Sequence, residues 1–333
     1  MTYPTTSQTA QHSPLIFPQM GCGTWAWGNR LIWDYDPSMD DALQQVFNLC
    51  VQNGVTFFDT GDSYGTGRLN GQSEKLLGRF TTAYTGPNIA QICLATKLAA
   101  YPWRLTQGTM VRAGNASIER MGRVDIAQMH WPTANYAPWQ EGPLLDGLTN
   151  LYQQGAIKGV GLSNYGPNRL HWVYKRFSER GTPIASLQVQ YSLLSTYPVT
   201  ELGLKDICDE LGIRLIAYSP LALGLLTGKY AVKGPFPKGI RGLLFRQLLP
   251  GIPRLLDCLR AIAQARGKTM AQIALNWCMC KGAMPIPGAK TVEQAQQNIG
   301  ALGWRLSEAE VYELDRAAQK TDRKMIQNIF QTR

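Results

Sequence analysis

The sequence has no apolar run close to the ~20 residues that a membrane-spanning helix needs. It also has no dense basic run, although 33 Lys and Arg against 23 Asp and Glu give a net charge of +10. Nucleic-acid interfaces cluster their cations on one patch, and here the cations are scattered. We therefore expect no membrane segment and no nucleic-acid partner; a phosphate-bearing small ligand, or plain solvation, accounts better for the charge.

Metal-binding patterns are missing as well. The seven cysteines show no zinc-like spacing, and the sequence contains only three histidines. Cys278 and Cys280 form an isolated pair within an apolar, helical stretch. We expect no metal site, and cysteines that are free, mostly buried and kept in a reducing compartment.

Residues 1–14 are polar and lack the basic start and hydrophobic run of a signal peptide and the Arg of a transit peptide. We expect a disordered tail over 1–14, one domain over 15–333, a cytoplasmic location and a monomer or weak oligomer. The 44% apolar and 17% charged content is globular, and no shift of composition marks a second domain.

The stretch Val55–Gly65, VTFFDTGDSYG, organises the rest of the chain. Val55–Phe58 is apolar and β-prone and follows an Asn-Gly turn signal, which predicts a buried strand. Asp59 stands at the strand end, and Tyr64 lies in the next, Gly-bounded loop. α/β enzymes place catalytic groups at this position. The ordinary alternative is a helix-capping Asp beside a half-buried Tyr.

Three further strand-like runs each deliver polar residues to their ends: Lys97, His130, and Ser163 with Asn164. The spacings from Asp59 onward are 38, 33 and 33 residues, which suit successive βα units of about 30 residues or more. Because parallel strands end on the same face of a sheet, we expect these side chains to converge.

Eight strands alternate with helices, which predicts an α/β fold, the single-domain (β/α)8 TIM barrel. The expected strands are a short one within Leu15–Trp27, then Val55–Phe58, Ile89–Thr96, Val124–Met129, Ile157–Leu162, Ser186–Tyr191, Arg214–Tyr218 and Met284–Pro287. Residues 220–253 form a Gly/Pro-rich excursion that we interpret as a lid.

Asp59, Tyr64, Lys97 and His130 offer a proton donor and an oxyanion stabiliser but no strong nucleophile. A Lys97 ammonium held by Asp59 should lower the pKa of Tyr64 from the ordinary phenol value of about 10. His130 can donate a hydrogen bond to a developing alkoxide. Such a set needs an external reductant, and hydride from a nicotinamide fits. Taken alone, Lys97 as a surface residue and His130 as a core residue are the ordinary alternatives.

Seven short motifs, taken in their order along the chain, resemble those of a known protein family. DTGDSYG, LATK, MHWP, GLSN, LQVQYSLL, AYSPLALGLLTGKY and IPGAK…QQN occur in that order. As a set they resemble the aldo-keto reductase superfamily over nearly the whole chain. The ending IPGAK…GALGWRLSEAE is most similar to the cyanobacterial and plant plastid branch, some of whose members are described as pyridoxal reductases.

The resemblance implies NADPH-dependent reduction of aldehydes or ketones to alcohols. Its catalytic residues would be Asp59, Tyr64, Lys97 and His130, with Tyr64 as the proton donor. Its cofactor-binding residues would be Ser163, Asn164 and Gln188 at the carboxamide, Asp59 and Tyr218 at the nicotinamide, Ser219, Pro220, Leu221 and Gly224 at the pyrophosphate, Gly288, Ala289, Lys290, Gln294 and Asn298 at the adenosine, and Gly23, Thr24 and Trp25. Lys290 favours a 2′-phosphate, and therefore NADPH over NADH. The ordinary alternative is a solvated Lys at the start of a helix.

Trp25, Trp103, Trp131 and Trp139 fall in three loops at the carboxyl ends of predicted strands. They suggest an apolar substrate wall that favours aromatic or bulky aldehydes. The expected substrate contacts are Trp25, Tyr64, Trp103, His130 and Trp131. Two other functions stay open: an NADP-binding regulatory subunit resembling the potassium-channel β subunits, and a phosphate-sugar isomerase that needs no nicotinamide.

Overall fold

The computed structural model of the chain describes residues 15–67 and 70–332. The tail expected over 1–14 lies outside the described residues. The strands are β1 (Cys22–Gly23), β2 (Phe57–Gly61), β3 (Cys93–Leu98), β4 (Ile126–Met129), β5 (Gly159–Ser163), β6 (Ile184–Gln190), β7 (Arg214–Tyr218) and β8 (Met284–Pro285).

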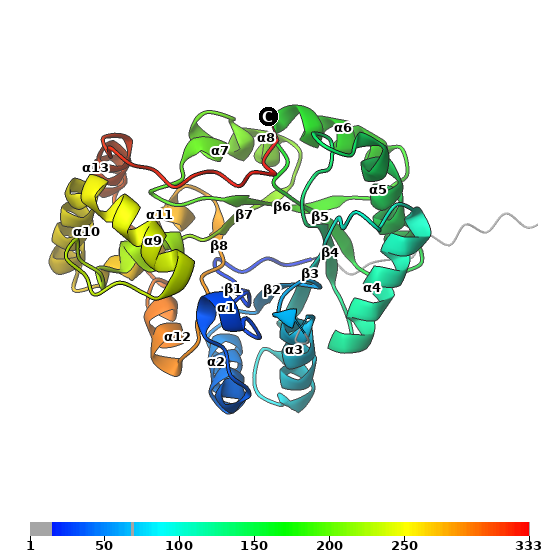
Figure 1. Cartoon of the computed structure of the whole chain (residues 1–333), viewed down its shortest axis with the longest axis horizontal. Helices are drawn as coiled ribbons and strands as arrows, with labels where there is room; N and C mark the ends of the chain where they lie inside the picture. The colour runs from blue at the N-terminus through cyan, green and yellow to red at the C-terminus, as the bar shows by residue number, and fades with distance from the viewer. Residues whose placement is uncertain (1–14, 68–69, 333) are drawn as a thin grey trace, which may run out of the picture.

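These strands form one eight-stranded parallel sheet in the order of the sequence, which confirms the predicted TIM barrel. The barrel closes where the Gly21 N–H donates to the Pro285 carbonyl (3.0 Å) and the Gly23 N–H donates to the Pro287 carbonyl (3.2 Å). A bridge between Gly23 and Gly288 continues this seam. In Figure 1 the helices surround the sheet on its outside. We call the carboxyl end of the barrel the mouth and its amino end the floor.

The α-helices of the described chain are α1 (Arg30–Trp33), α2 (Asp40–Gln52), α3 (Gln72–Ala83), α4 (Gln107–Met121), α5 (Pro138–Gln153), α6 (Pro167–Ser178), α7 (Tyr197–Thr200), α8 (Leu204–Glu210), α9 (Gly239–Leu248), α10 (Pro253–Arg266), α11 (Met270–Cys280), α12 (Val292–Ile299) and α13 (Glu308–Gln319). Short 3₁₀ turns are η1 (Pro37–Met39), η3 (Ile89–Gln91), η4 (Ala222–Thr227) and η5 (Leu249–Gly251). The sequence places most of these helices to within a few residues, and the Ser307–Glu310 capping box at α13 is present.

Several predicted boundaries were wrong. The strand expected over Val55–Phe58 is β2, Phe57–Gly61, so Asp59 lies within the strand and not after its end. The strand expected over Ile89–Thr96 begins only at Cys93, because Asn88 turns the chain with a φ of 63° into the 3₁₀ turn η3. Pairing with β2 starts where Cys93 lies opposite Phe57. Helix α5 starts at Pro138, with that Pro in the favoured first turn. Pro143 therefore lies inside the helix and does not begin it.

The segment 220–253 is folded. It contains η4, α9 and η5, and the Arg241 guanidinium of α9 donates to the Leu223 carbonyl of η4 at 3.0 Å. The expectation of a lid is not tested by this arrangement. What the structure adds is that α9 is held against the loop that follows β7.

The barrel interior changes character along its axis. Near the floor it is filled by a separate apolar cluster that includes Phe57, Ala95, Ile126, Ile216 and Met284. Two residues further along β2, β3 and β4 stand the buried polar side chains Asp59, Lys97 and Gln128, and β6 contributes the buried Gln188. Polar groups at such depth are stable only when they are hydrogen-bonded, so they should contact one another. No helix in the described ranges is both long and apolar enough to cross a membrane.

Candidate active site

Asp59, Lys97 and Tyr64 meet at the mouth. The Lys97 ammonium donates to Asp59 Oδ2 in a buried ion pair, and it also donates to the Tyr64 hydroxyl at 3.2 Å. Lys97 lies opposite Gly61 in the β2–β3 register, which brings it beside the loop that carries Tyr64. The structure therefore brings together a carboxylate, an ammonium and a phenol from two neighbouring strands.

The second oxygen of Asp59 is held by two amides. Gln128 Nε2 donates to Asp59 Oδ1 at 2.9 Å, and Gln188 Nε2 donates to the same atom at 2.8 Å. With Lys97 on Oδ2, the carboxylate is fixed in orientation by three donors. Sequence reasoning named Gln188 but missed Gln128. The available signal was a polar residue two positions before His130 in a strand that the sequence predicts.

Burial decides the charge states of this group. It raises the pKa of Tyr64 above the ordinary phenol value, and Lys97 lowers that pKa only part of the way back. The expected net lowering of the Tyr64 pKa is therefore not found, because removal from water outweighs one ammonium neighbour. Burial lowers the pKa of Lys97, but Asp59 and Tyr64 together outweigh it and the pKa is raised. At neutral pH the phenol is protonated and the ammonium is charged.

His130 follows β4 and lies beside the phenol. Its ring meets the Tyr64 ring edge-on, with centroids 5.9 Å apart, and its Nδ1 is 3.5 Å from the Ser63 hydroxyl. Burial, and then the charge of Lys97, lower the pKa of His130 well below its ordinary value. The imidazole is therefore neutral at pH 7 and offers one N–H donor in the same space as the Tyr64 hydroxyl.

Two residues at the mouth, one after β5 and one after β7, have strained backbone conformations. Asn164 and Ser219, each directly after its strand, have φ values of 65° and 51°. Non-glycine residues rarely adopt such values, and they concentrate at functional sites. A hydrogen bond joins the two strand ends: the Tyr218 hydroxyl donates to Asn164 Oδ1 at 2.8 Å. Asn164 in turn donates to the Ser163 hydroxyl at 3.1 Å, so three of the residues expected at the nicotinamide form one network.

The loop after β7 makes a tight turn toward the same end of the barrel. Ala222, Leu223 and Gly224 all have positive φ, and at 105° the Gly224 backbone is in a region that disfavours side chains. The Gly224 N–H donates to the Leu221 carbonyl at 2.9 Å. This turn contains the residues expected at a pyrophosphate, Ser219, Pro220, Leu221 and Gly224.

The expected adenosine residues lie on the loop and helix after β8. Lys290 donates through Nζ to the Trp33 carbonyl at 2.7 Å. Gln294 Oε1 accepts from the Lys290 N–H at 2.8 Å, and Asn298 donates to the Gly288 carbonyl at 3.4 Å. The Trp27 indole donates to the Ala289 carbonyl at 2.9 Å. These bonds fix the loop beside β1.

Two buried donors beside Lys290 have no partner among the described residues: Arg241 Nε and the Trp33 indole nitrogen. The Arg241 guanidinium lies 4.2 Å from the Trp33 ring centroid. Burial lowers the pKa of Lys290, and Arg241 and Lys229 lower it further against the opposing charge of Asp34. Buried donors and crowded cations are the arrangement that an anion would complete. Arg241 and Trp33 are candidate site residues that sequence reasoning missed, and no local motif marks them.

Gly23, Thr24 and Trp25 stand at the end of β1. Thr24 is fully buried, with its hydroxyl donating to the Asp59 carbonyl at 3.0 Å. Trp25 is partly exposed and meets Trp33 edge-on at 5.8 Å. Thr24 therefore supports the β2 backbone with its side chain, while Trp25 lies on the side of the adenosine residues.

The aldo/keto reductase family sequence model matches residues 19–319, which is most of the chain. The chain belongs to the aldo/keto reductase family. A pyridoxal reductase, chloroplastic, from Arabidopsis thaliana is 54% identical over 98% of this chain and 90% of its own length. An L-glyceraldehyde 3-phosphate reductase from Escherichia coli (strain K12) is 30% identical over 78% of this chain and 77% of its own.

Among solved structures, an aldo/keto reductase from Klebsiella pneumoniae in complex with NADP and acetate aligns with a TM-score of 0.70 and 26% identity, covering 93% of this chain and 95% of that one. The expected family, fold and reductase class are confirmed by these comparisons. The expected NADP(H) cofactor is confirmed at the level of the family. The Arabidopsis and Escherichia relatives are both named reductases, which favours an enzyme over a channel-type regulatory subunit.

The cytoplasmic location expected from the sequence is contradicted, because the 54% identical aldo/keto reductase is a chloroplastic enzyme. That expectation depended on the composition of residues 1–14 alone. Composition near one end of a chain is a weaker indicator of location than identity over 98% of it.

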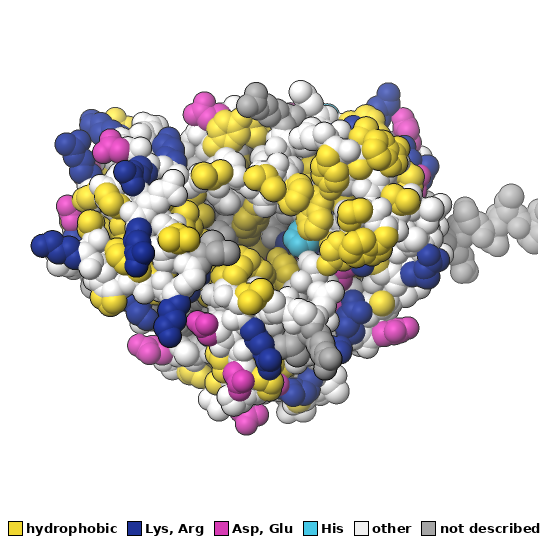
Figure 2. Space-filling model, viewed as in Figure 1, with side chains coloured by type: hydrophobic (Ala, Val, Ile, Leu, Met, Phe, Trp, Pro, Cys, Tyr) yellow, Lys and Arg dark blue, Asp and Glu magenta, His cyan; other side chains and the backbone are white. Residues whose placement is uncertain are grey.

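Aromatic side chains gather around the mouth of this aldo/keto reductase. Figure 2 shows a hollow with a His side chain in it and hydrophobic side chains along one side. The His130 ring lies 4.5 Å from the Trp131 ring. Trp103, by contrast, stacks on Tyr101 at 4.6 Å and is 69% exposed. The structure thus joins Trp131 to the expected catalytic residues, while Trp103 lies in a separate stack.

Proposed function

We propose that this protein reduces aldehydes and ketones to alcohols with NADPH, with Tyr64 as the general acid. The observation that carries this proposal is the contact of the Tyr64 hydroxyl with Lys97 at 3.2 Å, where Lys97 is itself paired with Asp59. A protonated phenol at the mouth, beside a neutral imidazole, is suited to a carbonyl oxygen that gains negative charge during reduction.

In the proposed reaction Tyr64 gives its proton to the carbonyl oxygen, and Lys97 stabilises the phenolate that remains. Asp59 keeps Lys97 charged and in place, while Gln128 and Gln188 keep Asp59 in place. His130 donates a hydrogen bond to the same oxygen and orients the carbonyl. NADPH supplies the hydride that reaches the carbonyl carbon.

The cofactor-binding set proposed here is the one expected from the sequence, with two additions. Ser163, Asn164, Gln188 and Tyr218 would hold the nicotinamide end, and the turn at Gly224 would hold the pyrophosphate. At the other end, Arg241 would join Lys290 on the 2′-phosphate, since its Nε has no other partner in the described part of the chain. Trp33 lies against both cations and offers its indole N–H.

For the substrate we propose pyridoxal, an uncharged aromatic aldehyde. The support is the 54% identical relative, named a pyridoxal reductase, together with the aromatic side chains beside His130. Arg104, the cation of the neighbouring loop, is already paired with Asp62 at 2.5 Å. A phosphorylated aldehyde would therefore have to compete with Asp62 in order to pair with Arg104.

The test is steady-state NADPH oxidation by the purified protein with pyridoxal, 4-nitrobenzaldehyde and glyceraldehyde 3-phosphate. We expect pyridoxal and 4-nitrobenzaldehyde to be reduced to their alcohols with kcat/KM at least about tenfold above that for the phosphorylated aldehyde, roughly the effect of one lost ion pair or aromatic contact. Tight NADPH binding without turnover of any carbonyl would contradict the proposal and favour a regulatory subunit. Failure to bind a nicotinamide would favour the isomerase alternative. Size-exclusion chromatography of the same sample tests the expected monomer or weak oligomer.

A further inference from the structure

A cavity lies at the floor, where the amino ends of β5, β6 and β7 meet. Its volume is about 620 Å³, within the range that small ligands occupy. The lining includes the apolar side chains of Phe17, Ile184 and Ile213, and also Arg214, the first residue of β7. We call this space the Arg214 cavity. It lies at the opposite end of the strands from the proposed active site.

The side chain of Arg214 is directed into the barrel. Side chains alternate between the two faces of a strand, so Arg214 shares a face with Ile216, two residues later in β7. Ile216 is fully buried in the apolar cluster that fills the barrel near the floor. The guanidinium therefore lies at the bottom of the barrel, next to an apolar layer, where a charge is costly unless it is paired.

Arg214 has no such pair in the part of the chain that the structure describes. Among residues 15–67 and 70–332 its side chain makes no hydrogen bond and no ion pair, and its Nε is buried. Burial lowers the pKa of Arg214, and the charge of Asp209 offsets this only in part. Asp209 is itself paired with Lys205 and is 63% exposed. Because a guanidinium stays charged at any ordinary pH, Arg214 is a partly buried cation that lacks a counter-ion.

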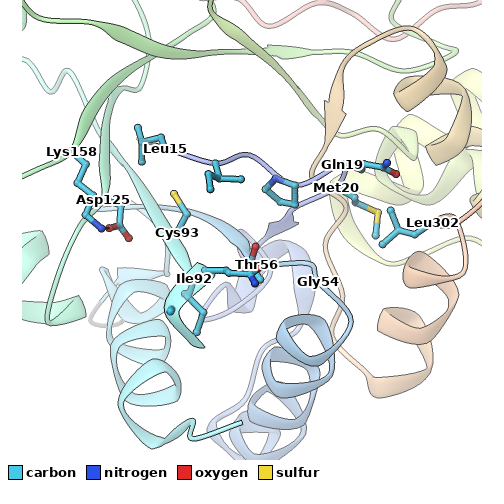
Figure 3. Close-up of a pocket in the computed structure, with 14 residues that line it drawn as sticks. Leu15, Gln19, Met20, Gly54, Thr56, Ile92, Cys93, Asp125, Lys158 and Leu302 are labelled. Atoms are coloured by element: carbon cyan, nitrogen blue, oxygen red, sulfur yellow. Dashed lines mark ion pairs between the residues drawn. The ribbon is translucent and has the colours of Figure 1, made fainter. Parts of the chain in front are cut away.

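The polar surroundings of Arg214 leave room for one negative charge. Lys158 also lines the cavity, but its Nζ is paired at 2.8 Å with the buried Asp125, beside which it stands in Figure 3. Residues 1–14 contain no Asp or Glu that could pair with Arg214. Opposite Arg214 in the β6–β7 register, the buried Ser186 hydroxyl also has no partner in the described ranges. A monoanion would satisfy the guanidinium, whereas a dianion would bring a second charge towards Asp125.

We propose that the Arg214 cavity binds a small carboxylate with an apolar body. The planar guanidinium matches the two oxygens of a carboxylate, which makes this pairing stronger than one to a neutral group. The body of the ligand would contact Phe17, Ile184 and Ile213 and remove their apolar surface from water. This site is separate from the proposed carbonyl reduction and does not depend on it.

The experiment compares Arg214→Met, which removes the charge and keeps an unbranched side chain, with Arg112→Met on the exposed surface of α4. The probe is 4-phenylbutyrate, titrated by calorimetry in the presence of saturating NADPH. We expect Arg214→Met to weaken its binding at least about tenfold, the effect of one charge-assisted hydrogen bond. Arg112→Met should bind it as the wild type does. The uncharged 4-phenylbutanol should bind the wild type at least about tenfold more weakly than 4-phenylbutyrate.

Hydrogen–deuterium exchange then locates the bound probe. We expect 4-phenylbutyrate to protect residues 208–216 in the wild type and not in Arg214→Met. Without the probe, the Tm of Arg214→Met should equal or exceed that of the wild type, because a cation without a counter-ion is replaced by an apolar side chain. The kcat for carbonyl reduction should stay the same in both variants, since the cavity lies at the other end of the barrel.

Equal binding of 4-phenylbutyrate by the wild type and Arg214→Met, or no binding by either, would overturn the proposal. Protection confined to the loops at the mouth would also overturn it, since the carboxylate would then occupy the active site. Should Arg214→Met fail to fold, Arg214→Gln is titrated in its place with the same expected loss. A large fall in Tm for both variants would show that Arg214 has a structural role and would refute the site. A wild-type protein that binds the probe at the floor but reduces no carbonyl would refute only the proposed function.

Discussion

The two ends of the barrel differ in what they enclose. At the floor, a cavity of about 760 Å³ lies beside the segment that enters β1, lined by Leu15, Met20, Cys93 and other residues, as Figure 3 shows. A second cavity of about 620 Å³ lies on the other side of Leu15. At the mouth, His130 lies in ring contact with Tyr64 and Trp131, and the buried Lys97 that is paired with Asp59 donates to the Tyr64 hydroxyl.

These two floor cavities therefore do not coincide with the buried ion pair and the phenol at the mouth. Asp125, the carboxylate of the floor cavity, is fully engaged: it is paired with Lys158 at 2.8 Å and Arg123 at 3.4 Å and accepts from the Leu94 N–H at 2.8 Å. Asp59 at the mouth is also held by three donors, but one of them is a lysine that contacts a proton donor. In a TIM barrel the strand direction, rather than the size of a cavity, locates the reactive end.

The largest difference between mouth and floor should appear when the proposed proton donor at the mouth is removed. Tyr64→Phe should lower kcat for carbonyl reduction by about 10²–10⁴-fold, because the general acid is lost while the ring is kept. NADPH affinity should change by less than about threefold. Tyr312→Phe, the same change on an exposed side chain of α13, is the control and should be silent. Retained reduction by Tyr64→Phe would show that the mouth does not work as proposed.

The matching change at the floor should affect stability and leave catalysis alone. Asp125→Ala removes a buried acceptor from the Leu94 N–H and two cations, so we expect a loss of about 2 kcal/mol in the free energy of unfolding. Values of kcat and KM should stay the same. Asp257→Ala, at an exposed ion pair with Arg260, should cost less than about 0.5 kcal/mol in the same denaturant titration. A drop in kcat with unchanged stability would mean that the floor contributes to the reaction.

A smaller effect on cofactor binding should show which residues contact the adenosine end of NADPH. Arg241→Met should weaken NADPH binding about tenfold, close to the value of one charge-assisted hydrogen bond, and should hardly change NADH binding. Arg246→Met, the same change on the exposed side of α9, controls for net charge. Equal dissociation constants of the two cofactors for the unaltered protein, by fluorescence titration, would already refute the expected preference for NADPH.

The smallest expected effect concerns pH. The pKa of Tyr64 is raised, so its proton is present below that pKa and is lost only as pH rises through it. The pKa of His130 is lowered, so the neutral ring is lost only as pH falls well below its ordinary value. We expect kcat/KM for reduction to be flat between about pH 6.5 and pH 9. An alkaline limb centred near neutrality would contradict the order of these pKa values.

Much of the mouth could be predicted from the sequence because each residue stands in the carboxyl half of its strand or in the loop that follows it. Asp59, Lys97 and His130 follow buried runs at βα spacing, and parallel strands necessarily end on one face. Gln188 was named through the family resemblance, on the motif LQVQYSLL. These are local patterns of the sequence. In a barrel of parallel strands the side chains they mark necessarily lie close together, at the carboxyl end of the sheet.

Other features could not be predicted because they depend on packing between distant segments. The sign of the Tyr64 pKa shift follows from how much water the fold removes, which no spacing encodes. Arg241 lies in an irregular stretch whose contact with Trp33 exists only once α1 and α9 meet. Phe330 stacks on Trp131 because the chain crosses the mouth after α13.

By itself, the sequence determined the barrel, the family and the identity of four converging side chains, because hydrophobic period and strand direction are local properties that fix which ends meet. Only the tertiary structure decided how those side chains are held and charged. It placed Gln128 on Asp59, left Arg241 Nε without a partner in the described residues, and stacked Phe330 on Trp131. Hydrogen bonds and ring contacts between distant segments depend on distances of a few ångströms, and those are set by packing.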